Sequence, residues 1–179
     1  MKKAFYYFLA VMGVFAYELA VAPFMPFGMD KMNVWLVAVV FVAVAFQFYQ
    51  GVVIGLVSAF LFELYSVLPF GAIMIAAGIT LSAVYLVYQR FLTNKSLYAT
   101  LMLTALATLV YSLVIFVYTA ARYFAKTNDV ALVYRLGRSA SGDFVIQMVM
   151  HLALVSFLFL IFHASSRRFG AAFIDTIKT

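Results

Sequence analysis

The chain has 179 residues, of which 68% are hydrophobic and 10% are charged, and its mean hydropathy is +1.10. This composition excludes an ordinary water-soluble domain, because a small soluble domain cannot bury so much apolar surface. The net charge of +6 does not predict nucleic-acid binding, since the basic residues form short clusters between apolar runs. We therefore expect the lipid bilayer to surround the chain and no nucleic acid to bind it.

Six stretches of the sequence are apolar and long enough to cross the hydrocarbon layer, which takes about 20 helical residues. They predict an all-α, polytopic integral membrane helical bundle. Because little sequence lies outside these stretches, we expect a single transmembrane domain over residues 1–179. The expected spans are 4–22, 32–49, 52–68, 72–88, 97–123 and 143–163.

The ends of the first three spans carry recognisable signals. The first span ends in small residues that resemble a signal-peptidase site, but we expect no cleavage, because Glu18 lies inside the span and Pro23 follows it. The second and third runs together are too long for one crossing, which predicts a break near residues 47–51. Pro69-Phe70-Gly71 then ends the third span, because proline interrupts a helix and glycine permits a reversal.

Residues 125–142 are the one extended polar stretch of the sequence. Apolar residues recur within it at helical spacing, which predicts a short amphipathic helix at the membrane interface. The apolar residues concerned are Val130, Leu132, Val133 and Leu136.

The lysines and arginines near the span ends predict the orientation, because cytoplasmic loops carry the excess. We expect a multi-pass protein of the cell inner membrane with both termini in the cytoplasm. This orientation places seven basic residues inside and five outside, although the basic stretch 122–138 opposes it. The inner set is Lys2, Lys3, Arg90, Lys95, Arg167, Arg168 and Lys178, and the outer set is Lys31, Arg122, Lys126, Arg135 and Arg138.

Small residues recur at every fourth position of the third span, where Gly51, Gly55 and Ala59 precede Glu63 on one helical stripe. Small side chains let helix backbones approach closely within a membrane. The stripe, extended by the turn at Gly71, is either a face for a partner protein or an internal packing face, and we favour internal packing. Ala16 and Ala20 in the first span form a similar pair with the same two interpretations.

Glu18 and Glu63 are the two carboxylates within the expected spans. An ionised group in hydrocarbon is costly, so each should face protein or water. Arg122 is expected at a similar depth, which predicts an intramembrane ion pair with one of them. We favour a structural role for this pair over a proton or cation site. His151 is expected to be a neutral helix-contact residue, and Gln147 an interhelical hydrogen-bond donor.

The sequence contains no cysteine and only two histidines, so neither a metal site nor a disulfide is expected. It also lacks a Ser-His-Asp set, a phosphate-binding loop, a dinucleotide motif and HExxH. We therefore expect no catalytic residue, no cofactor and no enzymatic activity.

The middle of the chain resembles the core of the rod shape-determining protein MreD family. The residues that carry the likeness are Gly51-Val-Val-Ile-Gly55-Leu56, then Glu63-Leu-Tyr-Ser66, then Pro69-Phe70-Gly71, within a region of about 33–116. Glutamate stands where the family commonly has aspartate, and Ala59 replaces a frequent glycine. Residues 125–142 have no counterpart in the family pattern.

The resemblance implies a non-enzymatic membrane scaffold of the bacterial cell-elongation machinery, which regulates cell shape and peptidoglycan synthesis. Its implied partners are an MreC-like membrane protein and other components of that machinery. It also implies a fold similar to the six-helix substrate-binding subunits of energy-coupling-factor vitamin transporters. Such a subunit is the alternative function, and it would dock a coupling subunit through Ala16 and Ala20. The scarcity of polar residues within the spans favours the scaffold.

Overall fold

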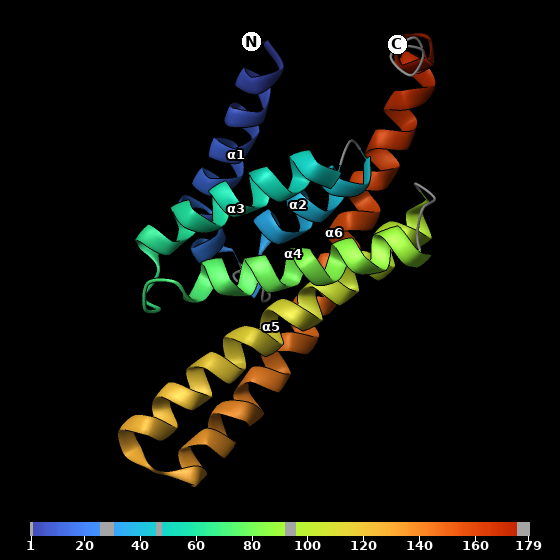
Figure 1. Cartoon of the computed structure of the whole chain (residues 1–179). Helices are drawn as coiled ribbons and strands as arrows, with labels where there is room; N and C mark the ends of the chain where they lie inside the picture. Colours follow the sequence, from blue (N-terminus) through green and yellow to red (C-terminus); the bar gives the residue numbers. More distant parts are fainter. Residues whose placement is uncertain (1, 26–30, 46–47, 92–95, 175–179) are drawn as a thin grey trace.

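The structure, a computed structural model, describes residues 2–25, 31–45, 48–91 and 96–174 (Figure 1). These ranges contain only helices and their connections, so the predicted all-α bundle is confirmed for the described part of the chain. The elements in order are α1 (Lys2–Ala20), the short 3-10 helix η1 (Ala22–Phe24), α2 (Val34–Ala45), α3 (Phe48–Tyr65), α4 (Ala72–Phe91), α5 (Leu97–Thr127) and α6 (Val130–Ile174).

Three helices of the described chain are long and apolar enough to cross a membrane. They cover Ala72–Arg90, Leu97–Thr127 and Val133–Ile161, where the fourth, fifth and sixth spans are expected. The outward surface is also apolar, since large side chains such as Phe157 and Leu160 are more than half exposed. Length and composition therefore make the chain a membrane protein. Shorter apolar helical stretches occupy Val11–Phe24, Val34–Val44 and Tyr49–Tyr65.

The second expected span, over 32–49, differs from the structure. Its helix, α2, has 12 residues, which rise about 18 Å, whereas the hydrocarbon layer is roughly 30 Å thick. Helix α2 is instead the centre of the bundle, where it contacts α1, α3, α5 and α6 and most of its apolar residues are buried. A helix that is hydrophobic all round belongs in a core. Its fully buried side chains include Leu36, Val37 and Val40.

The break predicted between the second and third spans lies partly outside the described residues, which exclude 46–47. Helix α3 begins at Phe48, so Gly51 lies inside the first turns of that helix rather than at the break. After α3, the chain reverses at the predicted place. Gly71 has a φ of 99°, a left-handed conformation that glycine adopts without steric cost, and α4 starts at the next residue.

The polar stretch 125–142 does not form a separate amphipathic helix. It contains the end of α5, a turn, and the start of α6, which continues to Ile174. Figure 1 shows the C-terminal part of α5 and the first part of α6 as an antiparallel hairpin that extends away from the other helices. Asn128 ends α5 in a left-handed conformation, with a φ of 52°, and its N–H donates to the Phe124 carbonyl. The Asp129 carboxylate then accepts from the Ala131 N–H and starts α6.

Candidate functional site

The small-residue stripe of α3 lies inside the bundle. A Cβ atom on Gly55 would lie 2.8 Å from Val39 of α2 and 2.9 Å from Leu81 of α4, and Ala59 is fully buried. A Cβ atom on Gly51 would lie even closer, 2.5 Å from the Cβ atom of Ala43 of α2. The structure therefore places this stripe in internal packing, where no partner protein can reach it. The small side chains allow α3 to lie directly against α2.

Glu63, at the end of the stripe, caps the helix that follows it. Its carboxyl group is buried, with 3% of the residue exposed, and Oε2 accepts a hydrogen bond of 2.8 Å from the Met74 N–H. Met74 is the third residue of α4, where backbone N–H groups have no partner within the helix. The other oxygen, Oε1, is buried without a hydrogen-bond partner. Glu63 thus ties the end of α3 to the start of α4.

Glu18 plays the same part for the first pair of helices. Its Oε1 accepts a hydrogen bond of 2.8 Å from the N–H of Trp35, the second residue of α2. Negative charge at a helix N-terminus is stabilised by the helix dipole as well as by these N–H donors. The two glutamates also share a sequence context. Glu18-Leu19 precedes Pro23-Phe24, and Glu63-Leu64 precedes Pro69-Phe70.

The predicted ion pair between Arg122 and a glutamate is not formed. Both carboxylates are directed to helix starts, and Arg122 is exposed on α5 without a salt bridge to either of them. The ion pair that the described residues do form joins Lys31, just before α2, to Asp143 of α6. The expected depth of a residue in the membrane does not reveal that these carboxylates bind backbone N–H groups instead of a cation.

His151 of α6 connects three helices. It is fully buried, its Nε2 accepts a hydrogen bond of 3.0 Å from the Asn33 N–H, and its Nδ1 lies 2.7 Å from Thr108 Oγ1. Because Nε2 accepts, the neutral ring must carry its proton on Nδ1 and donate it to Thr108. The Thr108 hydroxyl donates in turn to the Thr104 carbonyl. His151 is therefore placed as a helix-contact residue that holds the start of α2 against α5 and α6.

The partner of His151 belongs to a threonine row that the sequence interpretation missed. Thr100, Thr104 and Thr108 recur at every fourth position of α5, and each donates its hydroxyl to the carbonyl four residues earlier. All three are buried. This spacing in the sequence is the signal that could have identified the face of α5 that packs inward.

A mostly apolar cleft of about 280 Å³ with a few polar side chains lies between α5 and α6. Within it the Ser112 hydroxyl donates to Oε1 of Gln147 over 3.0 Å, so Gln147 makes an interhelical hydrogen bond as an acceptor. Asn33 and Tyr111 also line the cleft, and Asp143 lies at its wall, paired with Lys31. The cleft offers both hydrogen-bond donors and acceptors, but Asp143, the acidic residue in its lining, is already paired with Lys31.

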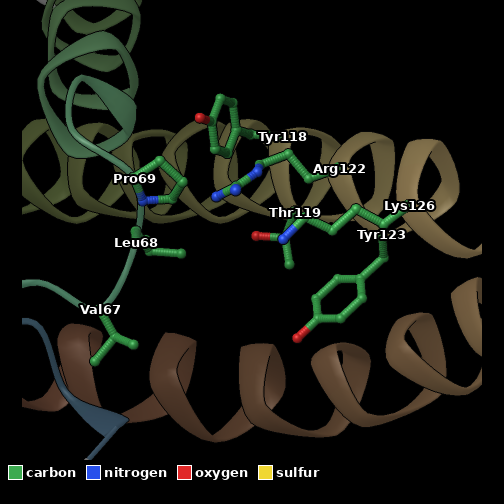
Figure 2. A pocket seen from close by; sticks show the side chains of 8 residues that line it. All are labelled: Val67, Leu68, Pro69, Tyr118, Thr119, Arg122, Tyr123 and Lys126. Carbon is green, nitrogen blue, oxygen red and sulfur yellow. The ribbon is translucent and has the colours of Figure 1, made fainter.

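A second pocket, of about 240 Å³, lies between the α3–α4 turn and the C-terminal part of α5 (Figure 2). Residues 67–69 form one wall, and Figure 2 shows the side chains of Tyr118, Arg122 and Lys126 along the other. We call this space the Arg122 pocket. Both basic side chains of α5, Arg122 and Lys126, line it.

The described residues contain no cluster of three or more metal-ligating side chains. Comparison of the chain with protein-family models, with curated proteins and with solved structures finds no match. The functional interpretation therefore depends on the geometry of the chain itself.

Proposed function

We propose that this chain is a non-enzymatic membrane scaffold, similar to the MreD family, that binds partner membrane proteins through helix–helix contacts. The observation that supports this function best is that the buried and partly buried polar side chains bind the backbone of neighbouring helices. Glu18, Glu63 and His151 each accept a backbone N–H at the start of a helix. These side chains hold the bundle together, so they are not arranged around a substrate.

The proposal gives the resembling segment a structural role. Gly51, Gly55 and Ala59 bring α3 against α2, while Glu63 and Gly71 set the reversal into α4. A rigid core of this kind suits a protein that presents outer helix surfaces to partners. The proposed partners are an MreC-like protein and other parts of the cell-elongation machinery, in the cell inner membrane. Figure 1 shows α1 beginning on the side of the molecule where α6 ends, as two cytoplasmic termini require.

Helix α1 offers the surface through which we expect the partner to bind. Ala16 and Ala20 are exposed, and a Cβ atom on Gly13 would meet no other atom within 4 Å. This Ala16–Ala20 face is therefore not used in packing among the described residues. A helix of another protein could approach its backbone closely.

Bulky residues on this face should block the partner. We expect the double variant Ala16→Phe/Ala20→Phe to co-purify with an MreC-like protein at a level at least about threefold below that of the wild type, which corresponds to a loss of at least about 0.6 kcal/mol in binding. The measurement is affinity purification of the tagged full chain from detergent-solubilised membranes. Ala153→Phe, at an exposed alanine of α6, is the matched control and should co-purify normally. Equal recovery of the partner with both variants would exclude this docking face.

The alternative function is a substrate-binding subunit of an energy-coupling-factor vitamin transporter. The cleft between α5 and α6 is the observation that favours it, because a small ligand needs an apolar pocket with a few hydrogen-bonding groups such as Asn33 and Gln147. Co-purification with an ATPase pair and a coupling subunit, together with nanomolar vitamin binding, would establish the alternative and exclude the scaffold.

A further inference from the structure

The Arg122 pocket has the composition of an anion site. Arg122 and Lys126 lie one turn apart on the same face of α5, and Tyr118 lies one turn before them. Thr119 and Tyr123 also line the pocket, and among the residues that the structure describes no acidic side chain does. Its lining therefore combines two positive charges with three hydroxyl groups, all of which can donate hydrogen bonds.

No described residue neutralises the two cations. Neither Arg122 nor Lys126 forms a salt bridge within the described part of the chain. The carboxylates that the sequence analysis offered as partners, Glu18 and Glu63, instead accept hydrogen bonds from backbone N–H groups at the starts of α2 and α4. A guanidinium and an ammonium that share a cavity without a counter-ion favour a bound anion, and the guanidinium can bind a phosphate through two parallel hydrogen bonds.

The position of the pocket indicates which kind of anion it takes. Arg122 follows the apolar run of α5, and the opposite wall is the turn that joins α3 to α4. Both features belong at the end of membrane-crossing helices, which is the depth of lipid headgroups. Beside the pocket, Val67 is fully exposed and 71% of Phe70 is exposed. An occupant with a phosphate and apolar chains would therefore contact both surfaces at once.

We propose that the Arg122 pocket binds the phosphate of an anionic glycerophospholipid, with the lipid chains lying against Val67 and Phe70. A lipid of net negative charge fits better than a zwitterionic one, because the pocket has no carboxylate to pair with a headgroup ammonium. This inference does not depend on the proposed scaffold function. It assigns a specific lipid contact to a site that the scaffold function does not use.

The test is lipid-dependent thermal stabilisation of the purified full chain in detergent, with phosphatidylglycerol as the probe. We expect the melting temperature of the wild type to rise with added phosphatidylglycerol. The variant Arg122→Gln/Lys126→Gln should need at least about tenfold more lipid for half of that rise, since each charged hydrogen bond it loses is worth a factor of about ten or more. Native mass spectrometry should show the same loss as fewer bound lipids, whatever the variant does to stability.

The matched control is Arg135→Gln/Arg138→Gln, which removes the same charge from exposed positions of α6 outside the pocket. It should respond to phosphatidylglycerol like the wild type. An equal loss in both double variants would reduce the effect to overall charge and overturn the proposal. Equal stabilisation by phosphatidylcholine would also overturn it, as would equal stabilisation by the same concentration of inorganic phosphate, which would indicate a site for small anions.

Discussion

Replacing His151 with alanine should lower the free energy of unfolding by about 3–5 kcal/mol, one of the two largest effects expected in this chain. The imidazole is fully buried, so its removal leaves a cavity among α2, α5 and α6. The Asn33 N–H and the Thr108 hydroxyl also lose their bonds to the ring. Thermal or denaturant unfolding in detergent, followed by circular dichroism, measures the loss.

Two further variants separate the hydrogen bonds of His151 from simple burial. His151→Gln keeps a side-chain oxygen that can accept from the Asn33 N–H, so it should retain more stability than His151→Ala. Ser156→Ala in the same helix removes a hydroxyl that bonds only to the Leu152 carbonyl of its own helix, and it should change stability by less than about 1 kcal/mol. If His151→Ala were as mild as Ser156→Ala, His151 would not be the connection among the three helices.

Replacing Gly51 with alanine should destabilise the protein by about 1–3 kcal/mol or more, because the added methyl group overfills a close contact. The new Cβ atom would lie 2.5 Å from the Cβ atom of Ala43 and 2.7 Å from its Cα atom. Backbone cannot rotate aside as a flexible side chain can, so α2 and α3 must separate. The melting temperature of the purified variant in detergent measures the effect.

Gly78→Ala is the matched control for this prediction, since it makes the same chemical change inside a neighbouring helix. A Cβ atom on Gly78 meets nothing within 4 Å. This variant should be neutral or slightly more stable, because alanine favours helix by roughly 0.5–1 kcal/mol over glycine. If both variants had the same melting temperature, the close packing of α2 against α3 would be contradicted.

The sequence predicts the positions of α4 and α5 well because their signals are local. Proline and glycine at 69–71 mark the reversal before α4, and Ser96 begins α5 by accepting from the Ala99 N–H. The shortness of α2 could not be predicted in this way. Its apolar run continues from Val34 to Tyr49 in the sequence, and hydrophobicity does not distinguish a helix buried in protein from one surrounded by lipid.

The polar stretch 125–142 shows the opposite limit of the same reasoning. Its apolar residues at helical spacing predicted a separate short helix at the membrane interface, but residues 130–142 belong to α6. Arg135 and Arg138 lie on the exposed side of that helix, and Leu136 and Gly137 face α5. Charged residues at helix spacing are compatible with a solvated helix face. The start of α6 is helical because it packs against α5. Local composition does not reveal this contact.

Glu18 and Glu63 were expected to face protein or water, but their partners could not be predicted. Glu18 and Glu63 do lie within the bundle, and charge matching suggested Arg122 as the group that satisfies one of them. The unpaired N–H groups of a helix start are an equally good partner for a carboxylate, and they leave no mark on the sequence. The contact of His151 with Asn33 joins residues 118 positions apart, which no spacing rule reaches.

The fold, the polar caps and the lipid pocket all require that the apolar helices lie in a bilayer with Glu18 and Glu63 turned toward helix starts. Extraction of isolated membranes tests most directly whether the helices lie in the bilayer. The protein should stay in the membrane pellet through alkaline carbonate and urea washes and enter solution only when detergent is added. Recovery as a monodisperse, folded protein in buffer without detergent would contradict it.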